Sequence, residues 1–170
     1  GAALSFVILF TLPCDAQKIP RIGLLSIGAD PARPVVWLPF LERMRELGYV
    51  EGQNITFERR FAAGRAERLS ELVADLVRLK VDLVVATGFR ENQAAKQAMP
   101  TTPIVMMVVA DPVGAGLVAS LARPGGNVTG LSTMTWELIG KRIELLEEAI
   151  PKATRMALLL GPRLPLRDLV

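Results

Sequence analysis

The stretch that decides the fold runs from Val81 to Asp111 and reads VDLVVATGFRENQAAKQAMPTTPIVMMVVAD. It contains two continuous apolar runs, LVVA at 83–86 and IVMMVV at 104–109, with a helix predicted between them over residues 91–99. Apolar runs without polar alternation are typical of strands that are buried on both faces of a parallel sheet. The stretch therefore predicts a strand–helix–strand unit near the centre of an α/β sheet.

The chain before this unit continues the alternation of strands and helices. An apolar run at 22–27 predicts a first strand, and the spacing of apolar residues over 34–47 predicts a helix that ends at Gly48. Residues 54–61 alternate between apolar and polar side chains, which predicts a half-exposed strand at the sheet edge. A helix is predicted over 66–80, and its inner face comprises Leu69, Leu72, Val73, Leu76 and Val77.

The chain after the central unit predicts four further elements. A short helix over 117–121 is followed by a turn cluster and by a fifth strand over 128–131. A helix over 136–150 is capped by Thr135, and a sixth strand is predicted over 155–160. The residues expected on the inner face of the last helix are Ile139, Ile143, Leu146 and Ile150.

Strands separated by helices imply right-handed crossovers and an open, parallel α/β sheet. With the second strand at the edge, the expected strand order is 2-1-3-4-5. Ligands of such sheets bind at the carboxyl ends of the strands, beside the point where the strand order reverses. This predicts a site formed by the loops at 26–33, 87–92 and 110–116.

Composition argues against most catalytic chemistry. The 170 residues include no histidine and one cysteine, Cys14, which removes His-based nucleophile arrangements, His-ligated zinc and an intrachain disulfide. The net charge of +3 is scattered along the chain, which is not typical of a nucleic-acid-binding surface. The expectation is a protein that is not an enzyme, has no cofactor and binds no nucleic acid.

Residues 1–16 resemble the end of an export signal. The apolar run at 2–12 is too short for the roughly 20 residues of a membrane-spanning helix, and Ala16 suits cleavage before Gln17. A start upstream of Gly1 would supply the missing basic segment. The alternatives are a buried first element of the fold, or a lipid anchor at Cys14, against which the preceding Pro13 argues. The expected location is the periplasm.

The predicted loops contain candidate ligand-binding groups. Ser26 and Gly28 offer a hydroxyl and backbone N–H groups, and the loop has no dinucleotide or P-loop motif. Thr87 and Gly88 precede a helix whose N-terminus favours an anion, with Arg90 as a further partner or an exposed side chain. Asp111 either binds a ligand or caps the following turn. Nothing in the sequence brings Asp30 to catalytic distance from Asp111.

Several long stretches resemble the substrate-binding proteins of ABC transporters, in the family that includes aromatic amino-acid binders of the TrpX type. The resemblance extends from about Arg21 to Leu160. Its stretches are RELGYVEGQNITFERR (45–60), GRAERLSELVADLVRLKVDLVVATG (64–88), AAKQAMPTTPIV (94–105), DPVGAGLVASLARPGGNVTGLS (111–132), GKRIELLEEAIP (140–151) and RMALLL (155–160).

The resemblance implies a type I periplasmic-binding-protein fold, in which two α/β lobes hold a small polar ligand, such as an amino acid, between them. It also implies an ABC permease and an ATPase as partners, with the membrane reached only through them, and no chemistry on the ligand. From the first lobe, Ser26, Thr87, Asp111 and Ser132 would line the cleft.

Two features depart from the family. Residues 89–92, FREN, replace small residues after the third strand, which would reshape the anion site. The chain also has about half the family's length, so the expected domains are a signal at 1–16, an amino-terminal lobe at 17–133 and an incomplete second lobe at 134–170. The alternatives are a non-functional remnant, a small-molecule enzyme on a flavodoxin- or Rossmann-like sheet, and a sensory domain.

Overall fold

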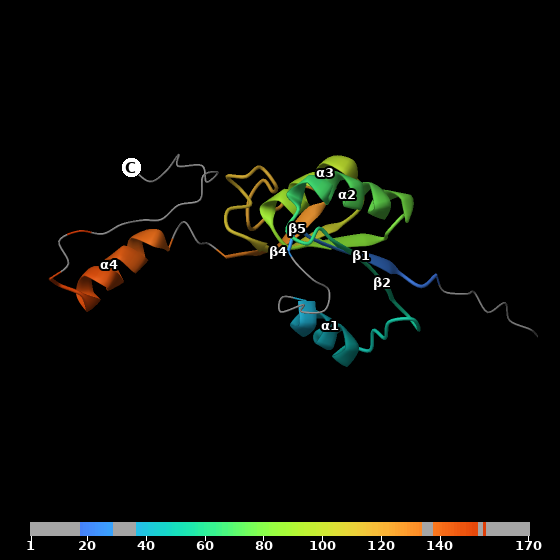
Figure 1. The fold of residues 1–170 in the computed structure, drawn as a ribbon, viewed down its shortest axis with the longest axis horizontal. Coiled ribbons are helices and arrows are strands. Elements are labelled where there is room, and N and C mark those ends of the chain that lie inside the picture. Colours follow the sequence, from blue (N-terminus) through green and yellow to red (C-terminus); the bar gives the residue numbers. More distant parts are fainter. Residues whose placement is uncertain (1–17, 29–36, 134–137, 153–154, 156–170) are drawn as a thin grey trace, which may run out of the picture.

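Five parallel strands form one open sheet in the order β2-β1-β3-β4-β5 (Figure 1). The structure, a computed structural model, describes residues 18–28, 37–133, 138–152 and 155. The strands are β1 (Arg21–Ser26), β2 (Thr56–Phe61), β3 (Leu83–Ala86), β4 (Ile104–Val109) and β5 (Val128–Ser132). The predicted fold class and strand order are confirmed.

Helices cover both faces of the sheet. Figure 1 shows α2 and α3 on one face and α1 on the other. The helices are α1 (Trp37–Glu46), α2 (Leu69–Arg78), α3 (Phe89–Ala98) and α4 (Ile139–Ala149), with a 3-10 turn, η1 (Ala66–Arg68), before α2. None of the described helices combines the length and apolar character needed to cross a bilayer.

Each face of the sheet has its own apolar core. On one face, Leu72, Val73 and Leu76 of α2 are buried together with Val84 of β3 and Ile104 of β4. The second core, under α1, comprises Leu24, Trp37, Ile55, Phe57 and Val85, with Phe40, Leu41 and Met44 packed against it. Burial of one such leucine or isoleucine contributes about 1.5–3 kcal/mol, so these cores fix the strand ends that carry the candidate site.

The strand register brings the ends of β1, β3 and β4 to one edge. Leu25 of β1 pairs with Ala86 of β3, and the N–H of Thr87 donates to the Leu25 carbonyl at 3.2 Å. The N–H of Val108 in turn donates to the Thr87 carbonyl at 3.1 Å. The residues that follow these strands therefore share one edge, as predicted.

Two predictions about side chains and turns were wrong. Val77 is 43% exposed, because it lies on the side of α2 that faces α3 rather than the sheet. Residues 117–121 form bends and irregular coil after a turn at 112–116, rather than a helix. Gly116 has a φ of +68°, and the N–H groups of Leu117 and Val118 both donate to the Pro112 carbonyl, which closes the chain on itself.

The predicted helix over 136–150 is confirmed for Ile139–Ala149, but its inner face is not buried among the described residues. Ile143 is 37% exposed, Leu146 47% and Ile150 55%, and Figure 1 shows α4 apart from the sheet. The predicted cap Thr135, the signal at 1–16 and residues 156–160 of the sixth strand lie outside the described residues. Those expectations stay predictions.

Candidate functional site

Three of the predicted site residues meet at the carboxyl ends of β1 and β3. Ser26 ends β1 with 8% of its surface exposed, and its Oγ accepts the N–H of Gly28 at 3.1 Å. Thr87 follows β3, and its Oγ1 lies 3.0 Å from Ser26 Oγ. Residues 61 positions apart in the chain thus form one polar corner at the point where the strand order reverses.

A fourth group in this corner, Glu91, was not among the predicted site residues. Its side chain reaches back from the first turn of α3 and is 5% exposed. Glu91 Oε1 accepts the N–H of Ile27 at 2.9 Å and lies 3.0 Å from Thr87 Oγ1. Because a carboxylate has no proton to give, Thr87 donates its single hydroxyl proton to Glu91, and Ser26 in turn donates to Thr87.

Gly88 is the N-cap of α3 and lies directly against Glu91. A Cβ at position 88 would lie 2.7 Å from Glu91 Oε2, so a side chain there would displace this carboxylate. The fully buried Asn92 ties the same turn together, because its Nδ2 donates to the carbonyls of Gly88 at 2.7 Å and Ala86 at 3.2 Å. Asn92 Oδ1 has no hydrogen-bond partner within the described ranges.

Arg90 does not contribute to this corner. Its side chain is exposed and forms no ion pair with the described part of the chain. The sequence offered one signal for Glu91: an acidic residue three positions after a helix N-cap commonly turns back toward the start of its helix. Here the N-cap glycine has no side chain, and the carboxylate bonds instead to the loop after β1.

Asp111 forms the turn cap that was one of its two predicted roles, and its predicted role in ligand binding stays a prediction. Its Oδ1 accepts the N–H of Gly114 at 2.7 Å, and its backbone carbonyl accepts the N–H of Ala115 at 3.1 Å, which closes a turn after β4. A Cβ at position 114 would lie 1.9 Å from Asp111 Oδ2, so a side chain there would force the Asp111 carboxylate out of this position. The Asp111 carboxylate therefore has a partner within its own loop.

Ser132 ends β5 beside the same loop. Its Oγ donates to the Ala110 carbonyl at 3.3 Å, and its side chain lines a cavity of about 200 Å³ with Met106, Val118 and Gly130. The six predicted residues thus form two groups on one sheet edge. Ser26, Gly28, Thr87 and Gly88 gather at β1 and β3, whereas Asp111 and Ser132 flank Ala110 at β4 and β5.

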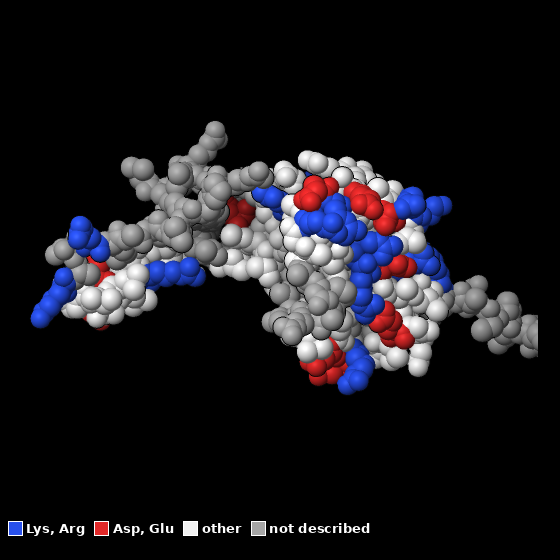
Figure 2. Space-filling view, in the orientation of Figure 1, with Lys and Arg blue, Asp and Glu red and all other residues white. Residues whose placement is uncertain are grey.

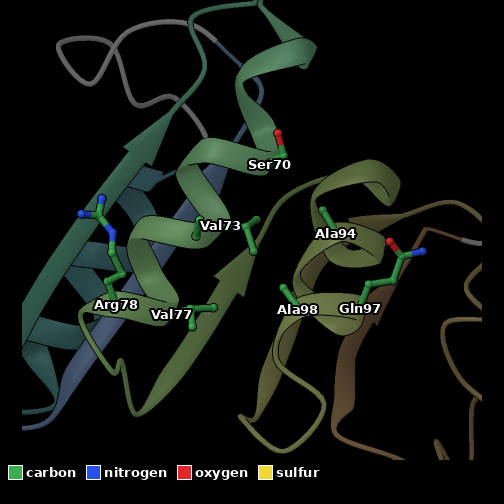
Figure 3. Close-up of a pocket in the computed structure, with 8 residues that line it drawn as sticks. Ser70, Val73, Val77, Arg78, Ala94, Gln97 and Ala98 are labelled. Atoms are coloured by element: carbon green, nitrogen blue, oxygen red, sulfur yellow. The ribbon is translucent and has the colours of Figure 1, made fainter.

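A larger groove, of about 580 Å³, lies elsewhere, between α2 and α3 (Figure 3). Figure 3 shows Val77 of α2 and Ala98 of α3 pointing toward one another across it. The rest of its lining comprises Ser70, Val73, Ala74, Arg78, Ala94 and Gln97. None of the predicted site residues lines this groove, and its predominantly small and apolar lining offers few groups to fix a polar ligand.

The charged side chains on the described surface are arranged as pairs of opposite sign rather than as a patch of one sign. Figure 2 shows Lys and Arg interspersed with Asp and Glu on the visible face of the molecule. The Arg59 guanidinium bonds to Glu51, with 2.8 Å between Nη2 and Oε2, and holds the pKa of that carboxyl below its usual value. Lys18 and the N–H of Arg21 lower the pKa of Asp82 in the same way.

The chain is similar in sequence to known proteins over most of its length. The family model described as "ABC transporter substrate binding protein" matches residues 21–165. The chain belongs to this family. Among curated proteins, it is 33% identical over 145 residues to the "Tyrosine-binding protein" of Clostridioides difficile strain R20291, which covers 85% of this chain and 41% of that one.

Solved structures about 30% identical to this chain share its fold. The ligand-free, open structure of a substrate-binding protein with adhesive properties from Clostridium difficile gives a TM-score of 0.69 at 31% identity, covering 79% of this chain and 45% of that one. A protein from Streptococcus pneumoniae in complex with L-Trp gives a TM-score of 0.61 at 30% identity, covering 66% and 38%. The chain thus spans less than half the length of each of these relatives.

Proposed function

We propose that this chain supplies the amino-terminal lobe of an extracytoplasmic receptor for an ABC importer. The receptor binds a small polar ligand, such as an amino acid, and performs no chemistry on it. The observation that carries the proposal is the corner formed by Ser26, Thr87 and Gly88, at the point of the sheet where α/β folds bind ligands. Family membership supports this role, and importer permease and ATPase subunits are the expected partners.

The relatives guide the choice of ligand. One is named for tyrosine and another was solved with L-Trp, so aromatic amino acids are the first compounds to test. In this proposal the corner at β1 and β3 contacts the polar end of the ligand, and Ser132 lines the cleft beside β5. Asp111 shapes the cleft through the turn that it closes rather than through its carboxylate.

The test is isothermal titration of the purified protein with L-tyrosine, L-tryptophan and a panel of other amino acids. Ser26→Ala should weaken binding of the best ligand about tenfold, the effect of losing roughly one hydrogen bond. Ser70→Ala is the matched control, because Ser70 is an exposed serine that lines only the groove between α2 and α3. Unchanged affinity in Ser26→Ala, or no binding by the panel, would contradict the proposal.

A further inference from the structure

The carboxylate of Glu91 is held as a bound anion would be. It lies at the N-terminus of α3, where unbonded N–H groups and the helix dipole favour negative charge. It accepts the N–H of Ile27 and the hydroxyl of Thr87, at 2.9 and 3.0 Å. These donors come from the ends of two different strands, β1 and β3, which meet at the site described above.

The same carboxylate has no cationic partner in the part of the chain that the structure describes. A buried carboxylate is ordinarily paired with a cation or fully hydrogen-bonded. Here a backbone N–H and a hydroxyl are the hydrogen-bond donors to Glu91, and the side chain is 5% exposed. The negative charge at this corner is therefore supplied by the chain itself.

We propose that Glu91 occupies, from within the chain, the carboxylate position at the carboxyl ends of β1 and β3, and so excludes a ligand carboxylate from it. The donors that an incoming carboxylate would need at Ile27 and Thr87 are already taken. A second carboxylate placed against Glu91 would be repelled. This exclusion involves only residues of the chain itself.

A consequence for the ligand follows, and it rests on the proposed receptor function. The end of the ligand that meets this corner is an ammonium or another hydrogen-bond donor, because Glu91 and the hydroxyl of Ser26 present acceptors there. For an amino acid, the carboxylate is then held at another part of the cleft. Glu91 thereby determines in which direction an amino acid lies in the cleft.

The test removes the carboxyl group of Glu91 by substitution and then supplies a carboxylate of the same size in solution. Glu91→Ala deletes the Cγ and the carboxyl group, which together have the heavy atoms of acetate. Thermal unfolding is followed at pH 7 in sodium acetate and in sodium chloride of equal ionic strength. Three further proteins serve as controls: the unmodified chain, Glu91→Gln, which keeps the space filled, and Glu71→Ala, which removes an exposed carboxylate on α2.

The expected result is a saturable rise of about 3–5 °C in the melting temperature of Glu91→Ala in acetate, with no comparable rise in the three controls. If Glu91→Ala is unfolded in chloride, recovery of its folded circular dichroism spectrum in acetate gives the same support. An equal response in all four proteins, or no recovery in acetate, would overturn the proposal. The compound added in this experiment is acetate and not an amino acid. The result therefore does not depend on whether the protein binds any amino acid.

Discussion

Gly130 of β5 lies so close to Met106 of β4 that a Cβ at position 130 would be 2.0 Å from the Met106 carbonyl oxygen. The φ angle of Gly130 is +138°, which side chains rarely tolerate. The pairing of β4 with β5 also shifts register between Met106 and Val109. Glycine at position 130 therefore allows β5 to approach β4 and places Ser132 beside Ala110.

Gly130→Ala should destabilise the protein by about 3 kcal/mol, because the added methyl group forces a clash with backbone in a strained conformation. Gly126→Ala is the control, since a Cβ there would meet nothing within 4 Å and its φ is ordinary. The control should change the free energy of unfolding by less than about 0.5 kcal/mol. Urea denaturation measures both, and equal stabilities for the two variants would refute this explanation.

Thr87→Val should lower the free energy of unfolding by about 1–3 kcal/mol, although the two side chains have nearly the same shape. The substitution removes the hydroxyl between Ser26 and Glu91 and leaves the buried carboxylate with one donor fewer. Thr101→Val, at an exposed position, should be close to neutral. Urea unfolding of both variants is the measurement, and a neutral Thr87→Val would show that the hydroxyl does not hold Glu91.

Asp82 should contribute a pH-dependent part of the stability. Its carboxylate bonds to Lys18 and accepts the N–H of Arg21 at 2.8 Å, so its pKa in the folded protein lies below the ordinary value of 3.8. A group with a depressed folded-state pKa stabilises fully above its unfolded-state pKa, and the contribution is lost as the pH falls through the folded-state pKa. Acid should therefore remove this contribution.

The variant Asp82→Asn tests this prediction. It should be less stable than the unmodified chain by about 1 kcal/mol at neutral pH, and the difference should shrink as the pH falls below 3.8. Glu42→Gln removes an exposed carboxylate that has no bond to a described residue and serves as the control. Stability is measured by urea unfolding at a series of pH values. A difference that stays constant into strong acid would contradict the assignment.

Truncation of Leu76 should destabilise the protein far more than truncation of Leu146. Leu76 of α2 is 0% exposed and packs in the core on the sheet, so Leu76→Ala should cost about 2–5 kcal/mol. Leu146 of α4 is 47% exposed, so Leu146→Ala should change stability by less than about 0.5 kcal/mol. Thermal and urea unfolding provide the comparison. A large loss in Leu146→Ala would mean that α4 packs against other residues.

The fold could be predicted because the strand signals are local. The continuous apolar runs of β3 and β4 and the alternation in β2 are enough to place the buried and edge strands. The irregular segment at 117–121 could not be predicted, because the spacing of its apolar residues fits one face of a helix, whereas Gly116 at a positive φ and the Pro112 carbonyl hold the preceding residues in a turn. In this segment the hydrogen bonds to the Pro112 carbonyl, rather than the spacing of apolar residues, determine the backbone conformation.

The site could be predicted only in part, because some of its contacts join residues that are far apart in the sequence. The strand order expected from the sequence is enough to place Ser26, Thr87 and Gly88 at one edge of the sheet. Glu91 bonds to Ile27 across 64 positions of sequence, and no local pattern indicates that contact. The direction of its side chain depends on the space left beside Gly88 and on the N–H of Ile27 that donates to it, and only the folded chain brings these two together.

The proposed function requires the corner at β1 and β3 to bind the ligand. The most direct test is a nuclear magnetic resonance titration of the ¹⁵N-labelled protein with L-tyrosine and L-tryptophan, following each backbone amide. If the corner binds the ligand, the amides of Gly28, Thr87 and Gly88 should shift saturably, whereas those of Ala94 and Ala98 in the α2–α3 groove should stay unchanged. Saturable shifts confined to that groove, or none at the corner, would contradict the proposed function.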